Sequence, residues 1–257
     1  MALKTTLNYS SNFNPQKRNR KHIKFLVFHY TGMKGETAAE KRLTNTKSQV
    51  SSHYLIKKNG EIITLVPNLY IAWHAGKSIW KNYKYLNKNS IGIEITNPGH
   101  SFVYKEFSKS QILSLIKLSM LLMKKYNINY KNILGHSDIA PDRKKDPGEK
   151  FPWEYLSKKK IGFWHKLKKD SLQRVRNLKI QNNEKKIFFQ NLSKIGYSIK
   201  FQKNLNSNKT KFLKNITKAF QRRFRPEIVN GKIDQECLLI SQNLVNKYII
   251  GSCSLIY

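Results

Sequence analysis

The sequence predicts an α/β protein with a small helical region at its C-terminal end. Three observations lead to this fold class. Short runs rich in β-branched and aromatic residues, typical of strands, occur between residues 23 and 135. Stretches of helical periodicity lie among them, and further helical patterns follow beyond residue 184. The length of 257 residues suits one sizeable domain and a smaller one.

The predicted strands lie in the first region. Residues 23–30 (IKFLVFHY) form a mostly apolar run, as expected of a buried strand. Residues 53–57 and 61–66 flank an Asn-Gly pair, which predicts a hairpin because Asn-Gly accepts the positive φ values of a tight turn. Residues 90–96 alternate like another strand, and residues 133–135 predict a short one.

The helices and connections complete the organisation. Residues 37–46 predict a short helix, and residues 110–126 a longer one with apolar side chains at helical spacing. A long loop is expected over residues 136–152, which are rich in Pro, Asp, Gly and charge. The sequence thus divides into an N-terminal extension, a main domain, a Lys-rich basic linker and a helical domain, over residues 1–22, 23–156, 157–184 and 185–257. The last of these contains three predicted helices, over residues 185–195, 213–224 and 235–248.

The formal net charge of +34 is the most extreme compositional feature. One interpretation is an anionic partner such as nucleic acid, a membrane surface or a cell-wall polymer. The other is compositional bias, because Lys, Asn and Ile are abundant along the whole chain while Arg is scarce. A nucleic-acid-binding protein would gather Arg on one element, and no such cluster is present. We therefore expect no nucleic-acid partner, and weak attraction to polyanions only as a side effect.

Other features bear on the compartment. The two cysteines, Cys237 and Cys253, lack metal-type spacing and are expected to be free thiols. Residues 1–22 contain no apolar stretch of the kind found in signal peptides, and no segment approaches the length of a transmembrane span. The expected location is cytoplasmic, with a periplasmic or envelope-associated location as the alternative.

Two histidines stand where predicted buried strands end. His29 closes one strand and His136 follows another, which is where a sheet delivers side chains into a cleft. With Asp146 they match the ligands of a catalytic zinc site, which uses neutral imidazoles and often a carboxylate and leaves one position open. The spacing alone leaves a structural role for each histidine open. Glu94 lies between two isoleucines on the 90–96 strand and so points to the face opposite theirs.

Several motifs resemble those of N-acetylmuramoyl-L-alanine amidases of the AmpD/AmiD type, in the family's order and spacing. The most specific is GHSDIAPDRKKDPG, and the resemblance spans about residues 23–153. The fold it implies is a central mixed β-sheet flanked by helices, as in peptidoglycan-recognition proteins. The motifs are FHYTG, SSHYLIKKNGEI, AWHAG, SIGIEI and GHSDIAPDRKKDPG, over residues 28–32, 51–62, 72–76, 90–95 and 135–148.

The resemblance implies a chemistry: zinc-dependent hydrolysis of the amide bond between N-acetylmuramic acid, including its 1,6-anhydro form, and L-alanine. The expected partner is peptidoglycan or an anhydromuropeptide, in cell-wall turnover or muropeptide recycling. A zinc ion with three protein ligands lowers the pKa of its bound water towards ~7 and polarises the scissile carbonyl. The implied residue roles are zinc ligation by His29, His136 and Asp146, proton transfer by Glu94, and oxyanion stabilisation by Lys144.

The implied substrate-binding residues are less distinctive. The family's arginine that meets the substrate carboxylate falls on Arg143, and a solvated loop charge is its alternative. Trp73 and His74 are expected to line a groove for sugar and peptide, with packing at the rim as the alternative. We expect His53 to be a buried, hydrogen-bonded strand residue. His22, His100 and His165 belong to no motif and are expected on the surface.

The C-terminal region resembles a three-helix peptidoglycan-binding domain. The resemblance lies in FFQNLSKIGY (188–197) and in the AFQ-x-x-F core with its G-x-x-D turn within residues 216–234. One departure is that Cys237 stands where that family usually has Thr. A helical bundle that only docks on the main domain is the alternative. For the whole chain, the alternative to an enzyme is a non-catalytic peptidoglycan-recognition protein.

Overall fold

The computed structural model describes residues 3–199 and 209–253 and has the predicted α/β fold, with a central mixed sheet flanked by helices. The strands are β1 (Thr6–Leu7), β2 (Phe13–Asn14), β3 (Phe25–Tyr30), β4 (Tyr54–Ile56), β5 (Ile62–Thr64), β6 (Ile71–Ala72), β7 (Ile79–Trp80), β8 (Tyr83–Lys84), β9 (Ser90–Ile95) and β10 (Ile133–Gly135). The α-helices are α1 (Glu36–Thr44), α2 (Lys109–Tyr126), α3 (His136–Ile139), α4 (Trp153–Lys158), α5 (Lys169–Val175), α6 (Asn182–Ile195), α7 (Lys209–Phe224) and α8 (Gln235–Cys253).

The main sheet has the strand order β1-β5-β4-β9-β3-β10. Its centre is parallel, because β3 pairs with both β9 and β10 in that sense and β4 pairs with β9 likewise. The β4–β5 hairpin is the antiparallel part, and it forms at the predicted Asn-Gly turn, where Gly60 has a φ of +89°. The carboxyl ends of β3, β9 and β10 therefore meet at one edge of the sheet, where parallel sheets carry their sites.

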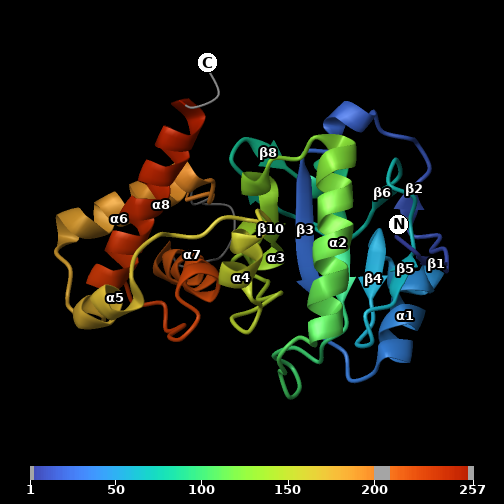
Figure 1. The fold of residues 1–257 in the computed structure, drawn as a ribbon, viewed down its shortest axis with the longest axis horizontal. Coiled ribbons are helices and arrows are strands. Elements are labelled where there is room, and N and C mark those ends of the chain that lie inside the picture. The colour runs from blue at the N-terminus through green and yellow to red at the C-terminus, as the bar shows by residue number, and fades with distance from the viewer. Residues whose placement is uncertain (1–2, 200–208, 254–257) are drawn as a thin grey trace.

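Alternation along β3 divides the apolar side chains between two cores. Leu26 and Phe28 belong to the core under α2, the green helix that crosses one face of the sheet in Figure 1. Phe25 and Val27 belong to the core on the opposite face. Both faces of the central strands are therefore covered, which explains why β3 is a nearly continuous apolar run.

Helix α2 is capped at both of its ends by residues that are typical of helix termini. Ser108 accepts a hydrogen bond from the Gln111 backbone N–H, and the Gln111 side chain accepts one from the Ser108 N–H, so the two form a capping box. Asn127 ends the helix in the left-handed region, with a φ of +52°. The buried face of the helix includes Leu115 and Leu122, both in the core beneath it.

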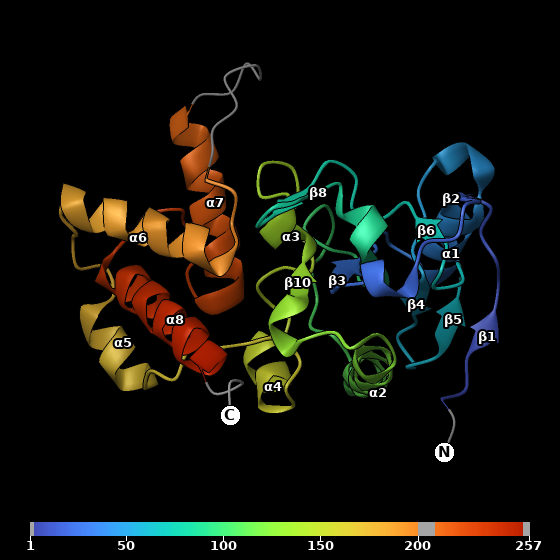
Figure 2. The same cartoon turned by 90° about the horizontal axis from the view of Figure 1, so that it is seen from above.

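The C-terminal helices pack directly against the β10 edge of the sheet. Figure 1 and Figure 2 both place α5 to α8 on that side, beyond β10 and α3. The core that contains Phe25 and Val27 also contains Tyr197 and Phe220 of the helical region. Trp80 stacks edge-on against Tyr197 with ring centroids 5.0 Å apart. The two regions therefore share one apolar core.

The segment over residues 157–184, predicted as a linker, contains structure that the sequence pattern did not reveal. It includes α5, and its side chains Ile161, Phe163 and Leu172 are buried. The Arg176 guanidinium forms a 2.6 Å ion pair with the buried Glu236 on α8. Lysines occupy its exposed positions, so the composition resembles a linker although the apolar minority is packed.

The N-terminal extension also joins the fold. β1 pairs in parallel with β5 at the end of the sheet, and β2 pairs with β6. The Arg18 guanidinium is buried and donates to backbone carbonyls, including that of Ser90 at 2.7 Å. Strands of two residues carry too little periodicity to be recognised from sequence.

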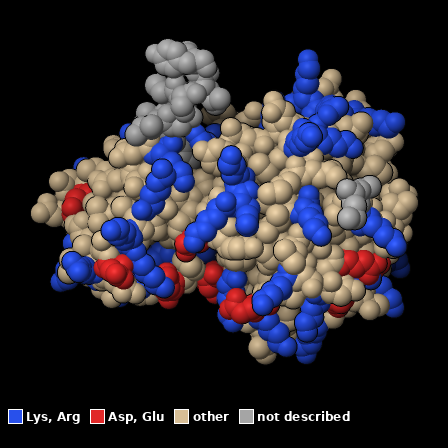
Figure 3. Space-filling view, in the orientation of Figure 1, with Lys and Arg blue, Asp and Glu red and all other residues tan. Residues whose placement is uncertain are grey.

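The charged side chains are dispersed. Figure 3 shows Lys and Arg across the whole visible face, over both the sheet domain and the helical region, without a single dense patch. This agrees with the expectation of a general compositional bias. Among the residues that the structure describes, none of the helices has the length and apolarity needed to cross a membrane.

Cys237 is buried, and its Sγ lies 3.6 Å from the Gln221 side-chain nitrogen. Peptidoglycan-binding domains of the type this region resembles usually have Thr at this position. In this chain the Cys237 thiol is packed in the core. The side chain of Cys253 lies outside the part of the chain that the structure describes.

Candidate active site

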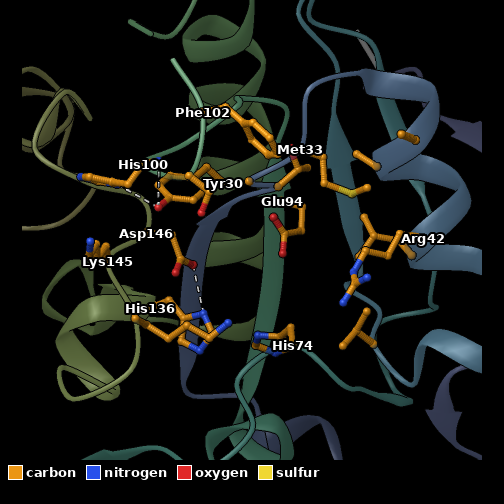
Figure 4. A pocket seen from close by; sticks show the side chains of 18 of the residues that line it. Tyr30, Met33, Arg42, His74, Glu94, His100, Phe102, His136, Lys145 and Asp146 are labelled. Carbon is orange, nitrogen blue, oxygen red and sulfur yellow. Dashed lines mark hydrogen bonds and ion pairs between the residues drawn. The ribbon is translucent and has the colours of Figure 1, made fainter. Parts of the chain in front are cut away.

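His29 and Glu94 are neighbours on adjacent parallel strands. The register of β3 and β9 pairs their Cα atoms, so both side chains leave the same face of the sheet. Figure 4 shows Glu94 at the cavity, with His136 and Asp146 across from it. The predicted alternation of residues 90–96 thus places Glu94 opposite its buried isoleucine neighbours.

His136 reaches the same face from β10. A loop was predicted over residues 136–152. The first residues of this segment instead form the short helix α3, which begins at His136. The Asp138 carboxylate accepts the Gly135 backbone N–H at 2.8 Å, which fixes the turn into this helix. The Ser137 N–H donates to the Asp146 carbonyl at 2.8 Å, so the two ends of the motif lie side by side.

Three ligand atoms from these elements converge. His29 Nδ1 lies 2.9 Å from His136 Nδ1 and 3.0 Å from Asp146 Oδ2, and His136 Nδ1 lies 3.0 Å from the same oxygen. All three residues are buried. The other nitrogen of His136, Nε2, lies 3.2 Å from the Ala75 carbonyl oxygen and therefore carries the proton of the neutral ring. Its Nδ1 then presents a lone pair to a carboxylate oxygen.

Lone pairs that face one another in a buried site call for a cation. Two imidazole nitrogens and one carboxylate oxygen match the ligands that zinc takes in catalytic sites. The pKa values agree with this use. Burial, together with the neighbouring His136, lowers the pKa of His29 to about 4 although Asp146 opposes the shift, so the ring is neutral and free to ligate. Burial alone would raise the pKa of Asp146, but contacts with His136 and His29 outweigh it and hold that pKa below its usual range.

Glu94 is the half-buried acid of the site. Its Oε2 atom is buried and has no hydrogen-bond partner among the described residues. Burial raises the pKa of Glu94 to about 8; the charge of Asp146 acts in the same direction and that of Lys144 opposes it. A carboxyl group with a pKa near neutrality suits a residue that accepts a proton and then returns it.

Lys144 and Arg143 both line the cavity but differ in their contacts. The charge of Lys144 acts to lower the pKa of both Glu94 and His29. The Arg143 guanidinium donates to the backbone carbonyls of Ala75 and Lys77. Arg143 is thus held against the wall of the cavity by the segment that also contacts His136.

The cavity above the cluster has a volume of about 920 Å³ and is lined by residues from the β3, β9 and α1 regions and from the 136–146 segment. Trp73 and His74 both line its wall. The Trp73 indole N–H donates to Asn14 Oδ1 at 2.7 Å. His74, however, is only 8% exposed, and its two ring nitrogens contact His29 and Ser90. His53 is fully buried and hydrogen-bonded, as predicted.

His100 was expected on the surface but lines the cavity. The ring contacts the Tyr30 hydroxyl at 2.8 Å and Glu149 at 3.0 Å, and both His100 and Tyr30 line the cavity (Figure 4). Arg222 of α7 lies 3.8 Å from the same Glu149. The histidine follows β9 by several residues without periodic spacing, so only the tertiary fold brings it to the site. Arg42 of α1 also lines the cavity, although it belongs to none of the sequence motifs.

The chain matches a protein-family model described as N-acetylmuramoyl-L-alanine amidase over residues 18–149. It is 34% identical to the N-acetylmuramoyl-L-alanine amidase AmiD of Escherichia coli K12 over 238 residues, which are 88% of this chain and 83% of that protein. It is 41% identical to the 1,6-anhydro-N-acetylmuramyl-L-alanine amidase AmpD of Haemophilus influenzae over 111 residues, 42% of this chain and 58% of that protein.

Solved structures are similar to this chain over most of its length. The structure of E. coli AmiD with the substrate anhydro-N-acetylmuramic acid-L-Ala-D-γ-Glu-L-Lys is similar with a TM-score of 0.75 and 33% identity, covering 91% of this chain and 93% of that one. The structure of AmpDh3 from Pseudomonas aeruginosa with an anhydromuramic pentapeptide has a TM-score of 0.74 and 31% identity, covering 91% and 94%. These matches include the C-terminal helices.

Proposed function

Because the chain belongs to the N-acetylmuramoyl-L-alanine amidase family, we propose that it is a zinc enzyme whose reaction takes place at the His29, His136 and Asp146 cluster. The bond cleaved is the amide between N-acetylmuramic acid and L-alanine of a peptidoglycan stem peptide. The observation that supports this most strongly is the convergence of the three ligand atoms within 3.0 Å of one another beside Glu94. Anhydromuropeptides are the proposed substrate class, since AmiD and AmpDh3 were solved with such molecules.

Each residue has a distinct proposed role. A zinc ion held by His29, His136 and Asp146 would supply a Lewis acid that polarises the carbonyl. Glu94 would accept a proton from the attacking water, whose oxygen bonds to the carbonyl carbon, and would pass a proton to the amine of L-alanine as the C–N bond breaks. Lys144 stabilises the negative charge that builds on the carbonyl oxygen. Arg143 is proposed to meet the carboxylate of the peptide, with Trp73 and His74 at the cavity wall.

A non-catalytic recognition protein on the same fold is the rival function. Binding alone requires neither a carboxyl group with a pKa near 8 nor three ligand atoms in register. The presence of Glu94 and Lys144 beside the complete cluster favours hydrolysis.

The experiment that tests the proposal is an assay of purified protein against soluble anhydromuropeptides and against intact sacculi, with and without a chelator. We expect release of free stem peptide, its loss with chelator and its recovery when zinc is added back. His136→Ala is expected to be inactive under all these conditions. Full activity in the presence of chelator, or in the His136→Ala variant, would refute the metal mechanism.

For the C-terminal region we propose peptidoglycan binding in addition to docking. The resemblance to three-helix peptidoglycan-binding domains supports it, and Gln221 of the AFQ-x-x-F core holds the following turn by accepting the Gly231 N–H at 2.7 Å. The test is co-sedimentation of the full-length Glu94→Gln variant with intact sacculi, in competition with soluble anhydromuropeptide. Binding that survives saturation of the active site supports the proposal, and complete displacement contradicts it.

A further inference from the structure

We infer that the dipeptide His74–Ala75 is a positioning element that holds both imidazole ligands of the proposed zinc site in the tautomer and orientation that zinc requires. The inference rests on the proposed function, and it assigns to the AWHAG motif a role other than lining the groove. His74 supplies a ring nitrogen to one ligand, and Ala75 supplies a carbonyl oxygen to the other.

The contact with His29 forms part of a directed chain of hydrogen bonds. His29 Nε2 lies 3.0 Å from His74 Nδ1, and His74 Nε2 lies 3.2 Å from Ser90 Oγ. The Ser90 hydroxyl itself donates to the Leu86 carbonyl at 2.6 Å, so its oxygen is left to accept from His74. His74 therefore carries its proton on Nε2 and accepts on Nδ1. His29 in turn carries its proton on Nε2 and keeps its Nδ1 lone pair for the metal.

Ala75 fixes the second ligand in the same way. Its carbonyl oxygen lies 3.2 Å from His136 Nε2, which must be the protonated nitrogen because a carbonyl only accepts. The proton on Nε2 leaves Nδ1 of His136 as the ligating atom. Two consecutive residues thus determine the tautomers of both histidines, although His29 and His136 come from different strands.

The dipeptide is itself anchored. Asn87 Oδ1 accepts the backbone N–H groups of His74 and Ala75, at 3.2 Å and 2.6 Å. The His74 ring lies on Gly92, where an added Cβ would stand 2.4 Å from its Cγ. Gly92 is two residues before Glu94 on the same face of β9, so the space left by the missing side chain is filled by a ring that supports the metal ligand. This gives a physical reason for glycine in the middle of a buried strand.

Groups that orient metal-bound imidazoles contribute to affinity without touching the metal, and their loss typically costs about 10- to 100-fold in metal affinity or activity. A matched pair of substitutions isolates this contribution. In His74→Asn, the amide oxygen replaces the Nδ1 acceptor. The leucine in His74→Leu branches at Cγ as asparagine does and has the same number of side-chain heavy atoms, but it accepts no hydrogen bond.

The measurement is the zinc dissociation constant of each full-length variant, determined by competition with a chromophoric chelator, together with the absorption spectrum of the cobalt-substituted protein. We expect His74→Leu to bind zinc about 10- to 100-fold more weakly than wild type, and His74→Asn to retain most of the affinity. The cobalt spectrum of His74→Leu is expected to change in intensity, whereas that of His74→Asn resembles wild type.

Equal zinc affinities for His74→Leu and His74→Asn would overturn the inference, because packing alone would then account for any loss. A wild-type protein that binds zinc no better than His136→Ala would instead overturn the proposed metal centre. Asn87 is partly exposed, so Asn87→Ala is a second test that leaves the packing of the core intact. It removes the acceptor of two N–H groups and is expected to weaken zinc binding in the same direction, while Asn87→Asp keeps that acceptor. Unchanged affinity in Asn87→Ala counts against the inference.

Discussion

The Tyr197 hydroxyl donates a 2.6 Å hydrogen bond to Oδ1 of Asp138, two residues after His136. Both side chains are buried, and Tyr197 belongs to the C-terminal helical region. The other carboxylate oxygen of Asp138 accepts from Gly135 and from the Arg223 guanidinium of α7. The carboxylate that shapes the turn at His136 is therefore held from one side by its own motif and from the other by the helical region.

Loss of this hydroxyl is expected to destabilise the fold. Tyr197→Phe removes one hydrogen bond to a buried charged group and leaves the ring packing intact, so we predict a decrease of about 1.5–3 kcal/mol in the free energy of unfolding. Urea denaturation of the zinc-free protein measures it. Tyr85→Phe is the control, because the Tyr85 ring is 58% exposed, and it should change little. A Tyr197→Phe variant as stable as the control would contradict the prediction.

Loss of the Arg223 side chain is expected to destabilise the fold more than loss of the Tyr197 hydroxyl, because it leaves the buried charge of Asp138 unpaired. Its guanidinium pairs with Asp138, donates to the Ile133 carbonyl at 2.9 Å and lies 4.2 Å from the Trp153 ring centroid. Arg223→Met should cost about 3–5 kcal/mol. The double variant Arg223→Met/Asp138→Asn should recover part of that loss, since no charge remains to be compensated. Additive losses in a double-mutant cycle would show that the pair is not coupled.

His53 predicts a dependence of stability on pH. Burial lowers its pKa well below 6.5, Arg18 lowers it further, and its Nδ1 accepts the Gly92 N–H at 3.0 Å. Below pH 6.5 the unfolded chain binds a proton that the folded chain does not, so stability falls as pH falls, by up to about 1.4 kcal/mol per pH unit. His53→Asn keeps the acceptor but does not titrate. Its unfolding free energy between pH 6.5 and 5 should therefore fall less steeply than that of wild type, and parallel curves would contradict the assignment.

Glu94 and Lys144 predict losses in the chemical step. Glu94→Gln removes the proton acceptor while preserving shape, and kcat should fall about 10²- to 10⁴-fold with zinc affinity retained. Lys144→Met should lower kcat about 10²- to 10³-fold with a smaller effect on KM, as expected for a group that acts mainly in the transition state. Lys150→Met is the control, since the Lys150 ammonium bonds to the Tyr104 carbonyl outside the cavity. Near-normal turnover by Glu94→Gln would remove it from the mechanism.

Local signals were sufficient to predict the central strands and α2. The apolar run before His29, the Asn-Gly turn and the alternation around Glu94 each reflect forces within a few residues. The same local signals predicted that His29 lies at the end of its strand and that Glu94 lies on the face opposite its isoleucine neighbours. The convergence of His29, His136 and Asp146 followed from the family motifs, because residues more than a hundred positions apart carry no mutual pattern.

The rest depended on tertiary packing. β1 forms because β5 offers it an edge, and α5 is stabilised by a few apolar side chains and by ion pairs such as Arg176–Glu236. His100 reaches the cavity only through its contacts with Tyr30 and Glu149. The orientation of His74 depends on the space above Gly92, which becomes apparent only when the two segments are seen together.

The central claim is that two imidazoles and one carboxylate bind a single zinc ion. X-ray absorption spectroscopy of the zinc-loaded protein tests it most directly. We predict one zinc per chain with two imidazole nitrogens at about 2.0–2.1 Å and a carboxylate oxygen at about 2.0–2.2 Å, and the loss of one imidazole in His136→Ala. A zinc shell without imidazole, or one that is unchanged in His136→Ala, would contradict the account.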